Sequence, residues 1–228
     1  MPKTNGIAKP VCVSGGAEGA DAVWVQTASR NNYTSKVMSF KGHHRTKLDG
    51  NIQVIELSPK ELGEADSKLK EANVYLKRAN YKMDLLRRNY YIIEKAESCY
   101  AIIDQFISKT KSNANQVRIK GGTAWGCQML VLEYIKSLGK DVSTAVPLYA
   151  FSQNENKWFQ AFCTVEKGIL TNVDWNVCQP TCPRNTFAGI GTRQIDSKGI
   201  QAITNLLQKR TFIQPPRPAA DKSVPTKL

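Results

Sequence analysis

The chain has 228 residues and a mass of 25.4 kDa, a length that suits one α/β domain or at most two small ones. Hydrophobic residues make up 41% of it, which is enough to bury a sizeable core and excludes a chain that is disordered throughout. Lys and Arg number 32 against 19 Asp and Glu, so the formal net charge is +13. That excess favours anionic partners, either polynucleotides or small phosphorylated ligands.

Targeting and metal signals are weak in this sequence. No run approaches the roughly 18 to 20 apolar residues that cross a bilayer, and residues 1–10 lack a signal-peptide pattern, so we expect a cytoplasmic protein without a membrane partner. The six cysteines are expected to be reduced, because no secretory signal accompanies them. Cys178 and Cys182 are spaced like metal ligands but lack further ligands nearby in sequence, so we expect no metal and no cofactor.

The first half of the chain reads as strands and helices in alternation. A short apolar strand at 11–13 leads into the loop SGGAEG and a helix over 20–30, and a second strand follows at 36–40. Ser58 and Pro59 predict the N-cap and first position of a helix that runs to about Arg78. A further helix is predicted over 82–97, and the continuous apolar run 99–103 is typical of a buried parallel strand.

The second half repeats the strand, glycine loop and helix pattern twice. A strand at 117–119 precedes the loop KGGTAWG and a helix to Leu138, and a strand at 186–190 precedes GTRQI and a helix over 197–209, with Asp196 or Ser197 as its N-cap. Between these units, a strand at 146–151 and the start of an antiparallel extension at 158–162 are predicted.

This order predicts an α/β fold with three layers and a mainly parallel, doubly wound sheet. We expect one domain over residues 1–210. Residues 211–228 are rich in proline and are expected to form a disordered tail. From Lys209 onward there are five basic residues and one acidic residue, so part of the +13 lies outside the expected domain.

The three glycine loops predict the functional site. Strands of a parallel sheet deliver their following loops to one edge, where the free N–H groups of helix N-termini favour anions. Neither GxGxxG nor GxxxxGK[ST] is present, so the dinucleotide fingerprint and the P-loop are both disfavoured. The residues expected to contact a ligand are Gly15, Gly16, Asp21, Arg88, Asn89, Gly121, Gly122, Thr123, Trp125, Gly191, Thr192 and Arg193.

Several of these residue types suggest individual roles. Arg193 suits a bidentate phosphate contact, whereas Glu18 and Asp21 would repel phosphate and therefore suit ribose hydroxyls or acid–base chemistry. They are the two candidate catalytic residues. Trp125 would either stack on a base or pack the helix against the sheet. His43 and His44 would supply acid–base function or be solvated loop residues.

A family resemblance emerges from several motifs in series. SGGAEGAD (14–21) resembles the phosphate-side loop of the SLOG superfamily of Rossmann-like domains, and five further motifs are similar to its YpsA-like branch. These motifs are FKGHHR (40–45), LLRRN (85–89), CYAI (99–102), KGGTAWGCQM (120–129) and FAGIGTR (187–193). The counterpart of the usual first strand and loop comes last here, which resembles the circularly permuted YpsA-like subfamily. The strand at 187–190 is therefore expected to lie parallel to, and beside, the strand at 11–13.

The resemblance implies binding of a nucleotide or nucleotide derivative, in a sensing or sequestering role, with Gly16, Asp21, Arg88, Asn89, Gly122 and Arg193 lining the pocket. A nucleoside-monophosphate phosphoribohydrolase is the alternative. The glycosidases of the superfamily carry PGGxGTxxE, however, and Gln128 stands near the position of its glutamate. Nucleic-acid binding driven by the net charge is a weaker alternative, and association into a homo-oligomer is left open.

Overall fold

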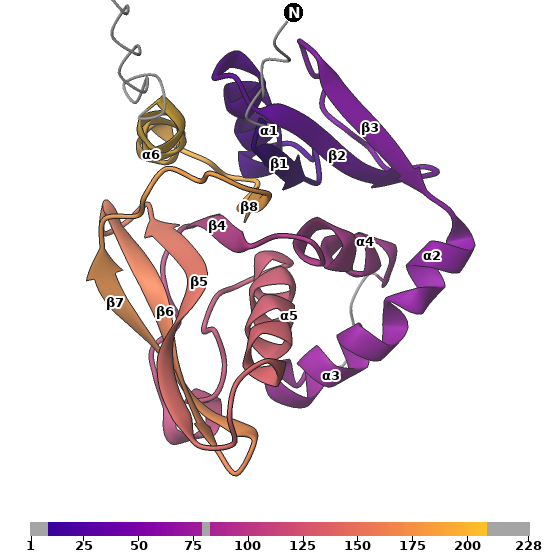
Figure 1. Cartoon of the computed structure of the whole chain (residues 1–228). Helices are drawn as coiled ribbons and strands as arrows, with labels where there is room; N and C mark the ends of the chain where they lie inside the picture. Colours follow the sequence, from indigo (N-terminus) through magenta and orange to yellow (C-terminus); the bar gives the residue numbers. More distant parts are fainter. Residues whose placement is uncertain (1–8, 79–82, 209–228) are drawn as a thin grey trace, which may run out of the picture.

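A computed structural model describes residues 9–78 and 83–208, and these form one mixed sheet of eight strands in the order β3-β2-β1-β8-β4-β5-β6-β7 (Figure 1). The strands are β1 (Val11–Ser14), β2 (Thr34–Phe40), β3 (Ile52–Leu57), β4 (Ser98–Ile103), β5 (Val142–Ser152), β6 (Lys157–Glu166), β7 (Ile169–Cys178) and β8 (Phe187–Gly191).

The sheet is mainly parallel, as predicted. β3, β2, β1, β8, β4 and β5 pair in parallel, and β6 and β7 continue the sheet as an antiparallel meander from β5. The predicted antiparallel extension is therefore confirmed, and it is longer than the sequence pattern indicated.

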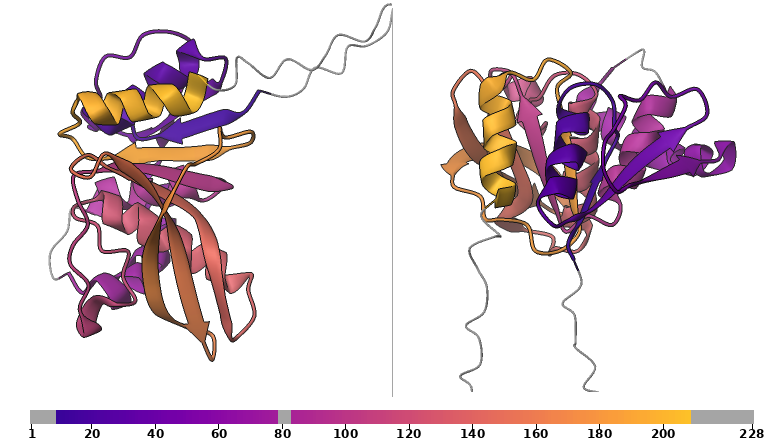
Figure 2. Two further views of the ribbon diagram at one scale, coloured as in Figure 1. Left: turned by 90° about the vertical axis from the view of Figure 1, so that its left-hand side faces the viewer. Right: turned by 90° about the horizontal axis from the view of Figure 1, so that it is seen from above.

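Helices cover both faces and complete three layers (Figure 2). α1 (Ala20–Arg30) and α6 (Ser197–Gln208) pack together on one face, over a core that includes Trp24 and Phe187. α4 (Met83–Ile93) and α5 (Thr123–Lys136) cover the other face, and α3 (Asp66–Leu76) packs against α5. α2 (Pro59–Glu64) connects β3 to α3. No described helix is long and apolar enough to cross a membrane.

The last strand of the chain lies in the middle of the sheet. β8 pairs in parallel with β1 through Cys12 and Phe187, and with β4 on its other side. The predicted neighbourhood of the strands at 187–190 and 11–13 is confirmed. The C-terminal end of α6 and the start of β1 lie on the same side of the molecule (Figure 2). This arrangement is the one in which a chain can be reopened without loss of its core.

Helix starts follow the predicted caps. The Ser58 side chain accepts a hydrogen bond from the Glu61 N–H while the Glu61 carboxylate accepts from the Ser58 N–H, a capping box that begins α2. At α6, Asp196 is the N-cap, because its Oδ1 accepts from the Gly199 N–H at 2.9 Å. The single helix predicted from 59 to 78 is wrong, since the chain breaks at Ala65 into α2 and α3.

Other sequence predictions need correction. Residues 117–119 are not a strand, because Arg118 has a φ of 53° and the backbone there bonds to side chains and a loop. Gly189 lies inside β8, within the strand predicted at 186–190, and a Cβ on it would lie 2.5 Å from Cγ of Trp24. β3 and β7 were not predicted. The tail expected at 211–228 lies outside the described residues.

Candidate functional site

A cavity of about 680 Å³ opens at the carboxyl ends of β4 and β8, between the loop that precedes α1 and the loop that precedes α5. Its volume is in the range of small-molecule sites. α4 supplies a third wall through Leu85, Leu86, Arg88 and Asn89. The predicted edge of the sheet is therefore hollowed, and residues of all three predicted glycine loops line the cavity.

An ion pair lies at the inner side of this cavity. Asp21, in the first turn of α1, is 7% exposed, and Arg88 of α4 is 5% exposed. Their Oδ2 and Nη1 atoms are 3.6 Å apart. Burial raises the pKa of Asp21, against the opposing effects of Arg88 and of hydrogen bonds from the backbone N–H groups of Gly191 and Gly15. Burial also lowers the pKa of Arg88.

These backbone contacts change the expected role of the first and third glycine loops. The amides of Gly15 and Gly191 were predicted to face a phosphate, but they donate to the carboxylate of Asp21. The carboxylate of Asp21 is therefore the anionic group that faces these two loop amides.

The packing explains why position 15 is glycine. A Cβ there would lie 1.7 Å from Nη1 of Arg88 and 2.4 Å from Oδ2 of Asp21. At Gly191, a Cβ would lie 2.6 Å from the carbonyl oxygen of Ile102. Both glycines therefore make room for the ion pair and for close strand packing rather than for a ligand.

The N-terminus of α5 presents a more open surface. Gly121 has a φ of 72° and space around its Cα, and a Cβ on Gly122 would meet nothing closer than 3.9 Å, the distance to Leu86. Neighbouring side chains hold the carbonyl groups of this turn: Asn89 donates to Gly122 O at 3.2 Å and Arg78 to Gly121 O at 3.4 Å. The first N–H groups of a helix lack partners within the helix, so this turn can receive an anion.

The cavity carries charges of both signs. Its cations are Arg78, Arg88, Lys120 and Arg193, and its acids are Glu18, Asp21 and Asp104. Arg88 and Asp21 compensate each other. Lys120 and Arg193 are exposed at the mouth and are available to an incoming ligand. The local field thus favours an anion near α5 and a hydroxyl-bearing group near the acids.

The structure brings most of the predicted residues together. Glu18, Asp21, Arg88, Asn89, Gly121, Gly122, Thr123, Trp125, Gly191, Thr192 and Arg193 all line the cavity. Gly15 lies behind the ion pair, and Gly16 packs against Val37, so neither reaches the cavity. Trp125 is 1% exposed and offers no free ring face, so its side chain packs the helix against the sheet.

Gln128 does not stand in for a catalytic glutamate. It is fully buried, and its Oε1 accepts a hydrogen bond from the Val117 N–H at 3.1 Å. It does not line the cavity. Its hydrogen bond to Val117 holds the segment before α5 against the helix, so the role of Gln128 is structural.

His43 lies outside the cavity lining, in the loop after β2. Its ring stacks on Phe40, with the centroids 5.0 Å apart, and its Nδ1 is 3.3 Å from Oγ of Ser39. Burial and the nearby cations, Arg88 first among them, lower the pKa of His43 to about 4. The imidazole is therefore neutral at pH 7. His44 is exposed.

Arg78, Asp104 and Asn154 also line the cavity and were not among the predicted residues. Asp104 directly follows β4, and Asn154 stands two residues after the end of β5. Polar residues that follow buried strands were a signal for both. Arg78 had no such signal, because it reaches the site from the end of α3. Among the described residues, no three His, Cys, Asp or Glu side chains gather in a way that could hold a metal ion.

Comparisons with known proteins do not assign a family. No protein-family model matches the chain, and no curated protein does. The DNA/pantothenate metabolism flavoprotein from Streptococcus pneumoniae is similar over 90% of this chain and 98% of its own, at 10% identity and a TM-score of 0.30. That likeness is too distant to carry a conclusion about family or ligand. The topology itself shows an α/β fold of three layers with a mostly parallel sheet of Rossmann-like type.

Proposed function

We propose that this protein binds a nucleotide or a nucleotide-derived phosphorylated molecule in the cavity at the carboxyl edge of the sheet, as a sensor or a sequestering protein. The observation that carries the proposal is the open N-terminal turn of α5, where Gly121 and Gly122 line a cavity of about 680 Å³. A phosphate group at this turn would gain the helix N–H groups and the exposed cations Lys120 and Arg193.

The acids of the cavity suit the sugar. Glu18 and Asp21 line the same cavity as the α5 turn, and carboxylates accept hydrogen bonds from ribose hydroxyls. The apolar side chains of Leu85, Leu86 and Ile119 offer surface for a base, in place of the buried ring of Trp125. A ligand with one phosphate, a sugar and a base matches this distribution.

The topology also supports the proposed kinship with a circularly permuted, YpsA-like member of the SLOG superfamily. β8 enters the sheet between β1 and β4, so the motif FAGIGTR of the chain's end lies beside the motif SGGAEGAD of its beginning. This neighbourhood is the one that a permuted order of the motifs requires.

Thermal unfolding in the presence of AMP, ADP-ribose and a cyclic nucleotide tests the proposal. A ligand present at 100 times its Kd adds about 2.7 kcal/mol to the free energy of unfolding. Gly122→Glu places a carboxylate at the α5 turn without backbone strain, because φ at residue 122 is −67°. It should abolish the response.

Gly139→Glu is the matched control, since Gly139 is exposed, has open space around it and does not line the cavity. Its response should equal that of the wild type. A folded wild-type protein that none of the three ligands stabilises would overturn the proposal.

A second candidate is hydrolysis of the N-glycosidic bond of a nucleoside monophosphate. The raised pKa of Asp21 favours it, because a raised pKa brings a carboxyl closer to the range in which it can exchange a proton with a substrate. Release of free base from AMP, followed by chromatography, tests this candidate. Loss of that release in Asp21→Asn or Glu18→Gln would assign the catalytic carboxyl, and an AMP-stabilised protein that releases no base would leave binding alone.

A further inference from the structure

The segment that precedes α5 contacts strand β7 and also contributes residues to the candidate site. Residues 104–122 connect β4 to α5 and contain one short 3-10 turn (Lys111–Asn113) as their regular structure. The last part of this segment, Ile119, Lys120, Gly121 and Gly122, lines the cavity. The conformation of residues 117–118 therefore sets the position of the turn that would bind a phosphate.

Val117 is held from two sides. Its N–H donates to Oε1 of Gln128 at 3.1 Å, and its carbonyl oxygen accepts from Nε1 of Trp175 at 2.9 Å. The Val117 side chain is fully buried. A buried carbonyl that loses its donor costs free energy, so this peptide is tied to the indole of Trp175.

Arg118 adds a second tie to the same strand. Its Nη2 donates to Val173 O at 3.1 Å and lies 3.7 Å from Oδ1 of Asp174. The side chain is 10% exposed, and its Nε finds no hydrogen-bond partner among the described residues. The φ of 53° at Arg118 is uncommon for a residue with a side chain, and it persists where the surroundings hold it.

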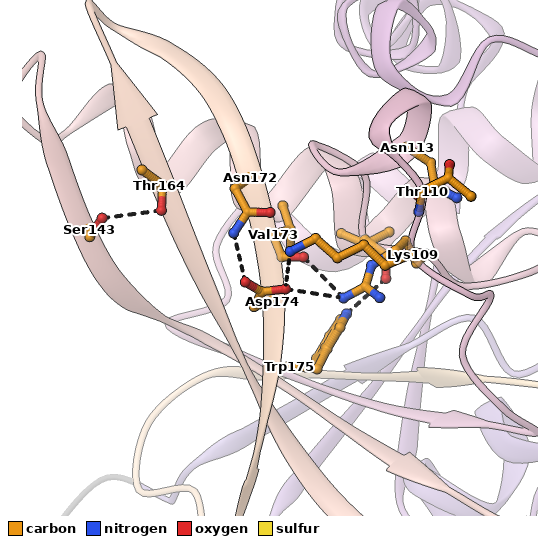
Figure 3. A network of polar contacts seen from close by, with 11 residues as sticks. Lys109, Thr110, Asn113, Ser143, Thr164, Asn172, Val173, Asp174 and Trp175 are labelled. Carbon is orange, nitrogen blue, oxygen red and sulfur yellow. Dashed lines mark hydrogen bonds and ion pairs between the residues drawn. The ribbon is translucent and has the colours of Figure 1, made fainter.

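The partners on β7 are themselves fixed. Asp174 accepts from Lys109 at 2.6 Å and from Asn172 at 2.7 Å, as Figure 3 shows. The Trp175 ring lies 4.8 Å from the ring of Phe106, centroid to centroid. Residues 104–122 are therefore joined to β7 at Lys109, Val117 and Arg118. The last two lie directly before the ligand-facing turn at 119–122.

We propose that Trp175 and Arg118 are positioning residues, which hold residues 119–122 in the conformation that receives the ligand without touching it. We call their contacts with Val117, Val173 and Asp174 the β7 clamp. The proposal assigns the antiparallel meander a function: it carries the anchor of the ligand-facing turn. It rests on the proposed function for the ligand and on geometry alone for the turn.

Two variants open the β7 clamp by separate routes. Trp175→Phe keeps an aromatic ring beside Phe106 but removes the N–H that Val117 uses. Arg118→Asn removes the guanidinium while keeping a residue type that tolerates a positive φ. Thr171→Val is the matched control, because it removes a β7 hydrogen bond to Thr164 O and lies outside the clamp.

Hydrogen exchange of residues 119–123 and AMP binding are measured for all four proteins. We expect faster exchange at 119–123 in both clamp variants, with β4 and β8 unchanged, and about fivefold weaker AMP binding, the factor of one lost hydrogen bond. Thr171→Val should match the wild type in both measurements.

Unchanged exchange at 119–123 would overturn the inference, as would an increase of the same size in Thr171→Val. Faster local exchange with unaltered AMP affinity would also overturn it. If the wild-type protein binds neither AMP nor ADP-ribose nor the cyclic nucleotide, the proposed function fails, and the exchange data decide the clamp independently.

Discussion

Replacing Arg88 with methionine removes the cation from a buried ion pair and leaves the carboxylate of Asp21 in place. The two side chains are 6% and 10% exposed, so water cannot replace the lost partner. Breaking a buried pair by removing one member costs roughly 3 to 5 kcal/mol. Asp21 keeps the hydrogen bonds from Gly15 and Gly191, so we expect a loss of about 3 kcal/mol in the free energy of unfolding, at the lower end of that range.

The loss should depend on pH. The pKa of Asp21 is raised in the folded protein, and removal of Arg88 raises it further. A group with a raised folded pKa stabilises the fold below its unfolded pKa, and this contribution is lost as the pH rises through the folded pKa. The destabilisation caused by Arg88→Met should therefore be largest at pH 8 and become smaller as the pH falls toward 5.

Urea unfolding followed by circular dichroism measures these free energies. Arg87→Met is the matched control, because Arg87 lies on the same helix and pairs with Asp66 nearer the surface, so its loss should be below about 1 kcal/mol. The double variant Arg88→Met with Asp21→Asn should recover about 2 kcal/mol relative to the sum of the single changes. Additive single effects, or a loss that does not change between pH 8 and 5, would refute this account of the pair.

Two further predictions concern the fold around the site. Gly189→Ala should destabilise the protein by about 1 to 3 kcal/mol in urea unfolding, because its Cβ would lie 2.5 Å from Trp24 Cγ. Gly63→Ala in α2 is the control and should be neutral or stabilising, since nothing lies within 4 Å of its added Cβ. Equal effects of the two substitutions would contradict the packing role of Gly189. Asp196→Ala should cost about 1 kcal/mol through loss of the α6 N-cap, and Asp196→Asn should retain most of the stability; an equal loss in both would argue against capping.

Most of the strands and the positions of the glycine loops were predictable because their signals are local, whereas β3 and β7 were not predicted. The apolar run at β4 and the caps at Ser58 and Asp196 depend on neighbouring residues, and the structure agrees with each of them. The segment 117–119 has the same apolar pattern, yet it is not a strand. Its backbone bonds go to Gln128 and Trp175, and the second of these is 58 residues away, so no local pattern reports them.

The candidate site shows the same division. Its position at the edge of the sheet followed from the order of strands, loops and helices, and most predicted residues do line the cavity. The role of Asp21 as the partner of two loop amides did not follow, because the sequence cannot show which group meets an N–H across the fold. Trp125 was predicted in the loop before α5, but it lies in the first turn of α5, and the packing of α5 against the sheet buries its ring.

The sequence by itself determined an α/β chain with a mainly parallel sheet, three glycine-rich loops and a strong positive charge, because composition, periodicity and turn residues are properties of short stretches. The tertiary structure decided how that charge is used. It pairs Arg88 with Asp21 out of water, and it leaves Lys120 and Arg193 exposed beside the open turn of α5. Contacts between segments that are distant in the sequence decide which cation has a structural role and which is available to a ligand. Only the folded chain brings those segments together.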